Sequence, residues 1–197
     1  MAISSVRAPE ELLGLAPEAA DELLDRLEAE VPVSGGSFDL PGPPAVEAIV
    51  FGDTHGDWRS TLAAARRFLD APGERCLVGL GDYVDRPPGD CPNGSVANLL
   101  YLLQLRAAFP DRVYLIQGNH ETSRRFPVVP HSLPEEVDDL WGPQEERYTR
   151  LMGLAERGAF AALSPSGAYL AHAGFPMEGA AREWRARLAE AAESAVL

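Results

Sequence analysis

Short apolar runs alternate with longer amphipathic stretches along most of this chain. Apolar runs too short for helices predict strands, the first of them buried, at residues 46–51, 75–80, 113–117 and 168–171. Stretches in which apolar residues recur every three or four positions predict helices at residues 17–30, 57–69, 95–109, 145–157 and 182–194. Ser95 is the expected N-cap of the third of these helices. Stretches rich in Pro or Gly predict loops at residues 34–44, 86–94 and 122–143.

The order strand, helix, strand, helix, strand predicts an α/β domain with a largely parallel sheet. A chain of 197 residues is long enough for one such domain. We therefore expect an N-terminal helix and loop over residues 1–45, followed by the main body of a single domain over residues 46–197. Parallel sheets bind ligands just beyond the carboxyl ends of their strands, so the residues after each strand are the candidates for function.

The chain carries a net charge of -13 at pH 7, from 30 acidic and 17 basic side chains. This charge repels the phosphates of nucleic acids, so DNA or RNA is not an expected partner. It also repels phosphorylated substrates, unless bound divalent cations reverse the field locally.

The two cysteines, Cys76 and Cys91, form neither a C-x-x-C pair nor a zinc-ligand spacing. Cys76 lies in an apolar run, where a buried thiol is the simplest expectation. Residues 1–11 lack the basic-then-apolar pattern of a secretory signal, and no apolar run is long enough to span a membrane. A reduced cytoplasmic protein without membrane contact is therefore expected.

A polar motif containing glycine follows each predicted strand. In chain order the motifs are Gly52-Asp53-Thr54-His55-Gly56, Gly81-Asp82-Tyr83-Val84-Asp85-Arg86, Gly118-Asn119-His120-Glu121 and His172-Ala173-Gly174. We expect all four at one edge of the sheet, converging on one cleft. Each motif alone would be an ordinary turn or helix cap, but the ordered combination points to a site. Its oxygen and imidazole groups suit Mn, Fe or Zn, and a carboxylate such as Asp82 can bridge two ions.

The motifs GDTHG, GDYVDR and GNHE, in this order, resemble the signature of the serine/threonine phosphoprotein phosphatases. These enzymes are a branch of the calcineurin-like metallophosphoesterase superfamily, and the glutamate that ends GNHE favours this branch. The segment HAGFP resembles the HGG-type segment of the family. The resemblance covers residues 46–176 and implies an α/β calcineurin-like metallophosphoesterase fold, with central β-sheets flanked by helices. Residues 46–197 would then be the catalytic domain, lacking the late C-terminal strands of the family.

The resemblance implies a binuclear metal centre. Asp53 and His55 match the ligands of the first metal, and Asp82 matches the carboxylate that bridges both metals. Asn119 and His172 match ligands of the second metal. The expected cofactors are two divalent ions, manganese first, with iron or zinc as alternatives.

The resemblance also implies the groups that handle the substrate. His120 matches the general acid that protonates the leaving alkoxide, and Asp85 matches the carboxylate that holds its imidazole. Arg86 matches a phosphate-binding arginine, a role that a guanidinium fork suits. Asn119 also matches a group that contacts the phosphate.

The sequence departs from the family pattern after His172. The family has a further metal-binding histidine and a phosphate-binding arginine in that region, but the 25 residues 173–197 contain no histidine. Arg182, Arg185 and Arg187 lie in a predicted helix, where a solvated face explains them. Three explanations stay open: a C-terminally truncated chain, a short form in which another group fills the position, or loss of strong binding at the second metal. His131 is the spare histidine, and an ordinary loop residue is its favoured interpretation.

The function that the resemblance implies is hydrolysis of a phosphomonoester by a metal-activated water, without a phosphoenzyme. A serine/threonine protein phosphatase acting on phosphorylated protein is the first expectation. A hydrolase of diadenosine polyphosphates or other nucleotides is the alternative, with Trp58, Tyr83, Arg124 and Arg125 as candidate contacts. A third possibility, of another class, is a catalytically decayed binding module.

Overall fold

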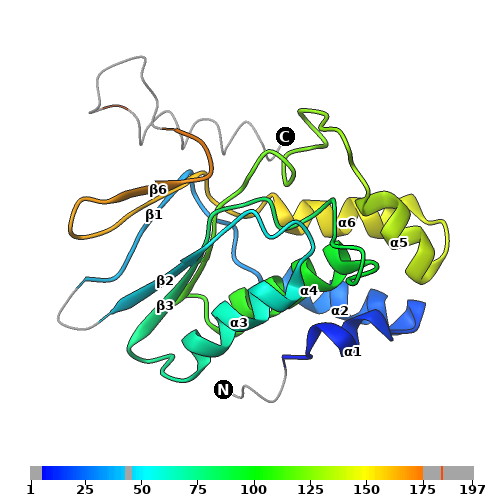
Figure 1. Cartoon of the computed structure of the whole chain (residues 1–197), viewed down its shortest axis with the longest axis horizontal. Coiled ribbons are helices and arrows are strands. Elements are labelled where there is room, and N and C mark those ends of the chain that lie inside the picture. Colours follow the sequence, from blue (N-terminus) through cyan, green and yellow to red (C-terminus); the bar gives the residue numbers. More distant parts are fainter. Residues whose placement is uncertain (1–5, 43–45, 175–182, 184–197) are drawn as a thin grey trace.

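The structure is a computed structural model that describes residues 6–42, 46–174 and 183. Its strands form two three-stranded sheets, and the helices gather beside them (Figure 1). In the first sheet β2 (Glu47–Phe51), β3 (Arg75–Gly79) and β4 (Val113–Leu115) are parallel and lie in that order. In the second sheet β5 (Ala161–Leu163) lies between β1 (Ser37–Asp39), which is parallel to it, and β6 (Tyr169–Ala171), which is antiparallel.

Strand β3, the central strand of the first sheet, is buried on both faces, and its successive side chains point to opposite sides. Leu77 faces the large core that the helices share. Its neighbours Cys76 and Val78 face a smaller core that includes Ala162 of the second sheet. A single parallel bridge between Ile116 and Ala159 joins the ends of the two sheets. In the described residues, the first sheet therefore lies between the layer of helices and the second sheet.

Helix α4 (Gly94–Ala108) lies at the centre of the helical layer and is buried from Gly94 to Arg106. Its leucine-rich sequence is apolar on most sides, as expected of a helix surrounded by neighbours. The helices around it are α1 (Pro9–Leu13), α2 (Pro17–Glu30), α3 (Trp58–Leu69), α5 (Leu133–Trp141) and α6 (Glu145–Ala155). Leu12, Leu24 and Leu27 of the N-terminal helices are fully buried in the same core as the α4 leucines.

Most of the expected elements are confirmed. The helices expected at residues 17–30, 57–69 and 145–157 correspond to α2, α3 and α6. The four expected strands correspond to β2, β3, β4 and β6. Asp57 caps α3, since its carboxylate accepts the backbone N–H groups of Arg59 and Ser60. The helix expected at residues 182–194 lies outside the described residues.

Several expectations were wrong for reasons of tertiary structure. Residues 34–44 contain β1, which is held by pairing with the distant β5 rather than by a local signal. Residues 122–143 contain α5, where Pro134 occupies the first turn, a position that tolerates proline. Strand β2 is an edge strand with only Ile49 buried. The N-cap of α4 is Asn93, and Ser95 lies within the first turn.

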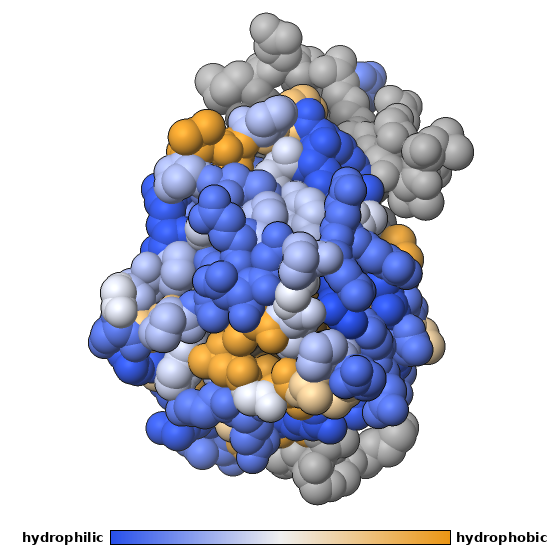
Figure 2. Space-filling view, turned by 90° about the vertical axis from the view of Figure 1, so that its right-hand side faces the viewer, coloured by the Kyte–Doolittle hydropathy of each residue, from blue (hydrophilic) through white to orange (hydrophobic). Residues whose placement is uncertain are grey.

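The order of the elements alone predicted one sheet, whereas the strands form two, as the family resemblance implied, because β6 pairs with β5 instead of joining β2, β3 and β4. Within the described residues, no helix is both long and apolar enough to cross a lipid bilayer. The face turned to the viewer in Figure 2 is mostly hydrophilic, with a compact apolar patch in its lower half.

Candidate metal centre

The predicted site residues meet where β2, β3 and β4 end, and His172 reaches them from the end of β6 in the second sheet. Backbone hydrogen bonds hold the loops side by side: Asp53 N–H donates to the Gly81 carbonyl, and His55 N–H donates to the Asp82 carbonyl. The backbones approach so closely that a Cβ on Gly81 would collide with the backbone of Gly118. The glycines of the motifs therefore make the convergence possible.

The Asp82 carboxylate is the centre of this cluster. It is buried, with its Oδ2 atom 3.5 Å from His55 Nε2 and its Oδ1 atom 3.5 Å from His172 Nε2. Two groups of possible metal ligands result, one of His55, Asp82 and His120 and one of Asp53, Asp82 and His172. Asp82 belongs to both groups, as a bridging carboxylate would. The structure groups Asp53 with His172 rather than with His55, and how the ligands divide between two ions stays a prediction.

Two imidazoles are oriented to present Nε2 to the cluster. His55 Nδ1–H donates to the Val84 carbonyl at 3.0 Å, and His172 Nδ1–H donates to the Leu80 carbonyl at 3.1 Å. With Nδ1 as the donor atom, Nε2 is the ring nitrogen left to offer a lone pair to a metal. The lone pair of His172 faces Asn119 Oδ1 at 3.1 Å and Asp82 Oδ1 at 3.5 Å. Acceptor atoms that face one another without a proton between them are suited to a cation, so the donor set fits a divalent metal.

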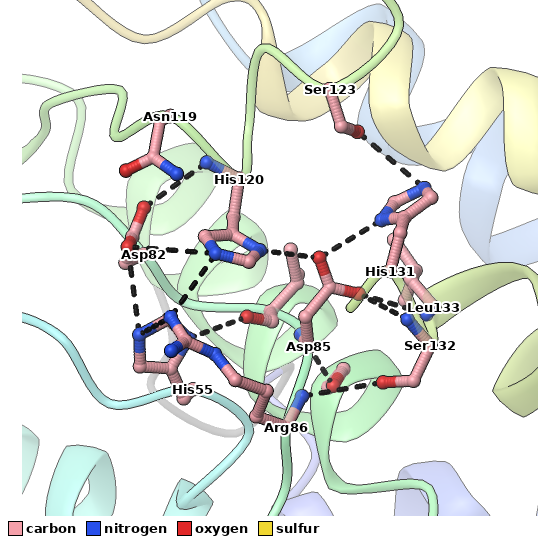
Figure 3. A network of polar contacts seen from close by, with 12 residues as sticks. His55, Asp82, Asp85, Arg86, Asn119, His120, Ser123, His131, Ser132 and Leu133 are labelled. Atoms are coloured by element: carbon pink, nitrogen blue, oxygen red, sulfur yellow. Dashed lines mark hydrogen bonds and ion pairs between the residues drawn. The ribbon is translucent and has the colours of Figure 1, made fainter. Parts of the chain in front are cut away.

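His120 and Asp85 form a second feature beside the cluster (Figure 3). His120 Nδ1 lies 2.6 Å from Asp85 Oδ2, and both side chains are buried. Burial opposes ionisation of Asp85, but hydrogen bonds from His131, His120 and the Leu133 backbone outweigh it and hold the pKa of Asp85 below its ordinary value. Asp85 is therefore a carboxylate that orients the imidazole and leaves Nε2 toward the cluster.

Arg86 bends over the site from the exposed side. One guanidinium nitrogen lies 2.6 Å from His55 Nε2 and 3.1 Å from His120 Nε2 (Figure 3). The guanidinium thus brings a positive charge to the exposed side of an otherwise acidic cluster.

The backbone at the site is unusual. Six non-glycine residues of the described chain have positive φ, and five of them are predicted site residues. These five are Asp53 (φ 50°), His55 (43°), Asp82 (55°), Asp85 (67°) and Arg86 (53°). Left-handed backbone of this kind is costly and concentrates where function requires a fixed direction of the side chains.

His131, the spare histidine, is not in either group of possible ligands among the described residues. It contacts Asp85 instead, with Nδ1 2.9 Å from Asp85 Oδ2. Sequence reasoning missed this pairing because the two residues are 46 positions apart and His131 lies in no motif.

Glu121 was also missed as a structural part of the site. It is 1% exposed, and its carboxylate accepts three backbone N–H groups, those of Asp82, Tyr83 and Gly118, at 2.7–2.8 Å. Burial raises the pKa of Glu121, an effect that these hydrogen bonds oppose. The side chain therefore ties the loop after β3 to the loop after β4. The sequence feature that could have pointed to this role is the position of Glu121 at the end of the GNHE motif.

We expect Glu121→Gln to lower the free energy of unfolding by about 2–3 kcal/mol, because the new amide N–H₂ must face a buried backbone N–H donor. Urea denaturation would measure the change, with Glu135→Gln on the exposed side of α5 as the matched control. Equal stability of the two variants would contradict this account of Glu121.

The residues considered as nucleotide contacts have other partners. Trp58 and Tyr83 are 8% and 2% exposed, and the Tyr83 hydroxyl donates to the Ile116 carbonyl. Arg124 and Arg125 both form ion pairs with Glu156. These side chains are therefore parts of the protein's own packing and surface.

Comparison with known proteins agrees with this geometry. Residues 47–185 match the sequence profile of the calcineurin-like phosphoesterases. Serine/threonine-protein phosphatase 7 of Arabidopsis thaliana is 31% identical over 127 residues, which are 64% of this chain and 29% of that protein. A PP2A-like serine/threonine-protein phosphatase of Candida albicans is 33% identical over 108 residues, 55% of this chain and 24% of that protein. The matches thus span less than a third of either relative.

Among solved structures, a protein serine/threonine phosphatase from Saccharomyces cerevisiae aligns with a TM-score of 0.70 at 19% identity. The alignment covers 87% of this chain and 53% of the yeast chain. At this identity the likeness shows that the two proteins share a fold.

Proposed function

This chain belongs to the calcineurin-like phosphoesterase family, and on that premise we propose that it hydrolyses phosphomonoesters at a binuclear metal centre. The observation that carries the proposal is the position of Asp82. One buried carboxylate is shared by two groups of possible metal ligands and lies beside the buried His120–Asp85 pair. A phosphatase needs both features, metals to bind the phosphoryl group and an acid to protonate the leaving group.

The proposed metal ligands are Asp53, His55, Asp82, Asn119 and His172. Two divalent ions bound there would polarise the phosphoryl group and lower the pKa of a shared water. Manganese is the proposed metal, and iron or zinc would suit the same oxygen and imidazole donors. The proposal includes no further ligand from the C-terminal region, because that region lies outside the described residues.

The proposed role of His120 is to protonate the leaving alkoxide. As water attacks phosphorus and the bond to the serine or threonine oxygen breaks, the imidazolium gives its Nε2 proton to that oxygen. Asp85 holds Nδ1–H at 2.6 Å and fixes the direction in which the His120 ring presents Nε2. The Arg86 guanidinium, already next to both Nε2 atoms, would orient the phosphate oxygens, and Asn119 would contact the same phosphate.

The proposed substrate is phosphoserine or phosphothreonine in a protein, in line with the names of the two matched relatives. A cavity of about 600 Å³ opens beside Asn119 and His172, with Phe126, Phe160 and Tyr169 in its lining. It would offer apolar surface to residues that flank the phosphorylated side chain. A nucleotide substrate is less favoured, because Trp58 and Tyr83 are buried in the protein's own core. The two buried, free cysteines support a reduced, cytoplasmic setting as part of the proposal.

Metal removal tests the proposal directly. We expect the chain to hydrolyse para-nitrophenyl phosphate, to lose this activity after chelation, and to regain it when manganese is added. Elemental analysis should find about two metal ions per active chain. Absence of activity, with one ion or fewer bound, would overturn the proposal and favour the decayed binding module.

A further inference from the structure

The Asp85 carboxylate contacts two imidazoles, those of His120 and His131, although only His120 has a role in the proposed mechanism. Its Oδ2 atom lies 2.6 Å from His120 Nδ1 and 2.9 Å from His131 Nδ1 (Figure 3). The Asp85 side chain is fully buried, so no water competes for this oxygen. The two histidines therefore lie on either side of one carboxylate oxygen, and the direction of each depends on the other.

The segment just before α5 is held so that His131 lies beside Asp85. The next two residues, Ser132 and Leu133, donate their backbone N–H groups to the other oxygen, Asp85 Oδ1, at 2.8 and 2.9 Å. These N–H groups lie at the N-terminus of α5, where the helix favours a negative charge. Four donors thus saturate the Asp85 carboxylate, and three of them come from residues 131–133.

The second nitrogen of His131 is held as well. His131 Nε2 lies 2.8 Å from the Tyr148 hydroxyl on α6. The Asp85 carboxylate can only accept, so His131 Nδ1 carries the proton directed at Oδ2, and Nε2 accepts from the Tyr148 hydroxyl. The bond from Tyr148 stabilises this tautomer, because a Nε2 atom that accepts a hydrogen bond does not carry a proton. Tyr148, His131, Asp85 and His120 therefore form one continuous chain of hydrogen bonds.

We propose that His131 is a positioning residue for His120, which it acts on through the shared Oδ2 atom of Asp85, with Tyr148 fixing its tautomer. This inference rests on the proposed function, in which His120 is the acid. With His131 present, Asp85 Oδ2 is held between two imidazoles, and the His120 ring keeps one orientation toward the cluster. Substitution of a residue that orients a functional side chain through a hydrogen bond commonly lowers activity by about 10- to 100-fold.

Kinetics of three variants test the proposal. His131→Leu is expected to lower kcat for phosphoserine hydrolysis about 10-fold, with KM and metal content unchanged. His131→Asn, whose side-chain N–H can replace the Nδ1 donor, is expected to restore most of that loss. Tyr148→Phe, which removes only a hydroxyl, should lower kcat about 2- to 10-fold, as expected for one hydrogen bond. The matched control is Tyr114→Phe, which removes a hydroxyl that donates to Asp111 in another part of the core and should leave kcat unchanged.

A measurement without substrate separates this inference from the proposed function. The chain has four histidines, so the imidazole N–H signals of ¹⁵N-histidine-labelled protein can be assigned by NMR. We expect low-field Nδ1–H signals from His120 and His131, and a clear shift of the His120 signal in His131→Leu and in Tyr148→Phe. An unmoved His120 signal in both variants, or an unchanged kcat in an active enzyme, would overturn the inference. An inactive wild-type chain whose His120 signal shifts would overturn the proposed function alone.

Discussion

Replacing His120 with glutamine is expected to slow hydrolysis of phosphoserine by about 10²- to 10⁴-fold, the range for loss of a general acid. A serine alkoxide is a poor leaving group and must receive a proton as the bond to phosphorus breaks. Glutamine has a side-chain N–H group but no proton that it can give up at neutral pH. Steady-state kinetics would measure the loss, and elemental analysis should show unchanged metal content, since His120 is not among the proposed ligands.

The leaving group provides the control for this prediction. Para-nitrophenolate leaves without a proton, so His120→Gln should slow its release far less than it slows the release of serine. An equal loss for both substrates would mean that the imidazole serves the site in some way other than proton transfer. Unchanged turnover of phosphoserine would remove His120 from the mechanism.

Asp82→Asn is expected to lower metal affinity by more than about 100-fold, beyond the loss typical of residues outside the ligand set. Asp82 belongs to both groups of possible ligands, so one substitution removes charge from both at once. Asparagine keeps one side-chain oxygen, which can still accept the His120 backbone N–H that Asp82 Oδ1 accepts at 3.1 Å. The fold should therefore survive while phosphatase activity falls to that of the chelated chain.

Metal titration by calorimetry would test this second prediction, with Asp139→Asn as the matched control. Asp139 lies on the exposed side of α5, so its substitution removes the same charge from the protein without touching the site. Two tightly bound ions in Asp82→Asn would refute a bridging role for this carboxylate. A similar loss of affinity in the control would point to the net charge of the chain instead.

The central sheet and the convergence of the motifs could be predicted from local sequence. The runs that became β2, β3 and β4 are apolar, and each ends at a glycine-containing motif, so parallel pairing brings the motifs to one edge. The second sheet could not be predicted in this way. Strand β1 has no apolar pattern of its own and exists because β5, more than a hundred residues later, pairs with it.

The same limit applies within the site. His172 was expected beside the other motifs and lies there. Its strand, β6, belongs to the second sheet and not to the sheet that carries the other motifs. The prediction was therefore right because of the motif, although the expected strand pairing was wrong. The pairing of His131 with Asp85 depends on α5, a helix hidden in a Pro-rich stretch. Glu121 was visible as a letter in a motif, but its three backbone contacts depend on how two loops pack.

The left-handed backbone of the site also limits which sequences could ever build it. Most L-residues lose about 1–2 kcal/mol in this conformation, whereas glycine, Asp and Asn adopt it more readily. An alanine scan would therefore measure two losses at once at Asp53, Asp82 and Asp85, the missing oxygen atoms and the strained main chain. Replacing Asp with Asn isolates the chemical loss. In a redesign of this centre, the left-handed backbone therefore restricts which residue types can stand at these positions, and the requirement for metal ligands restricts them further.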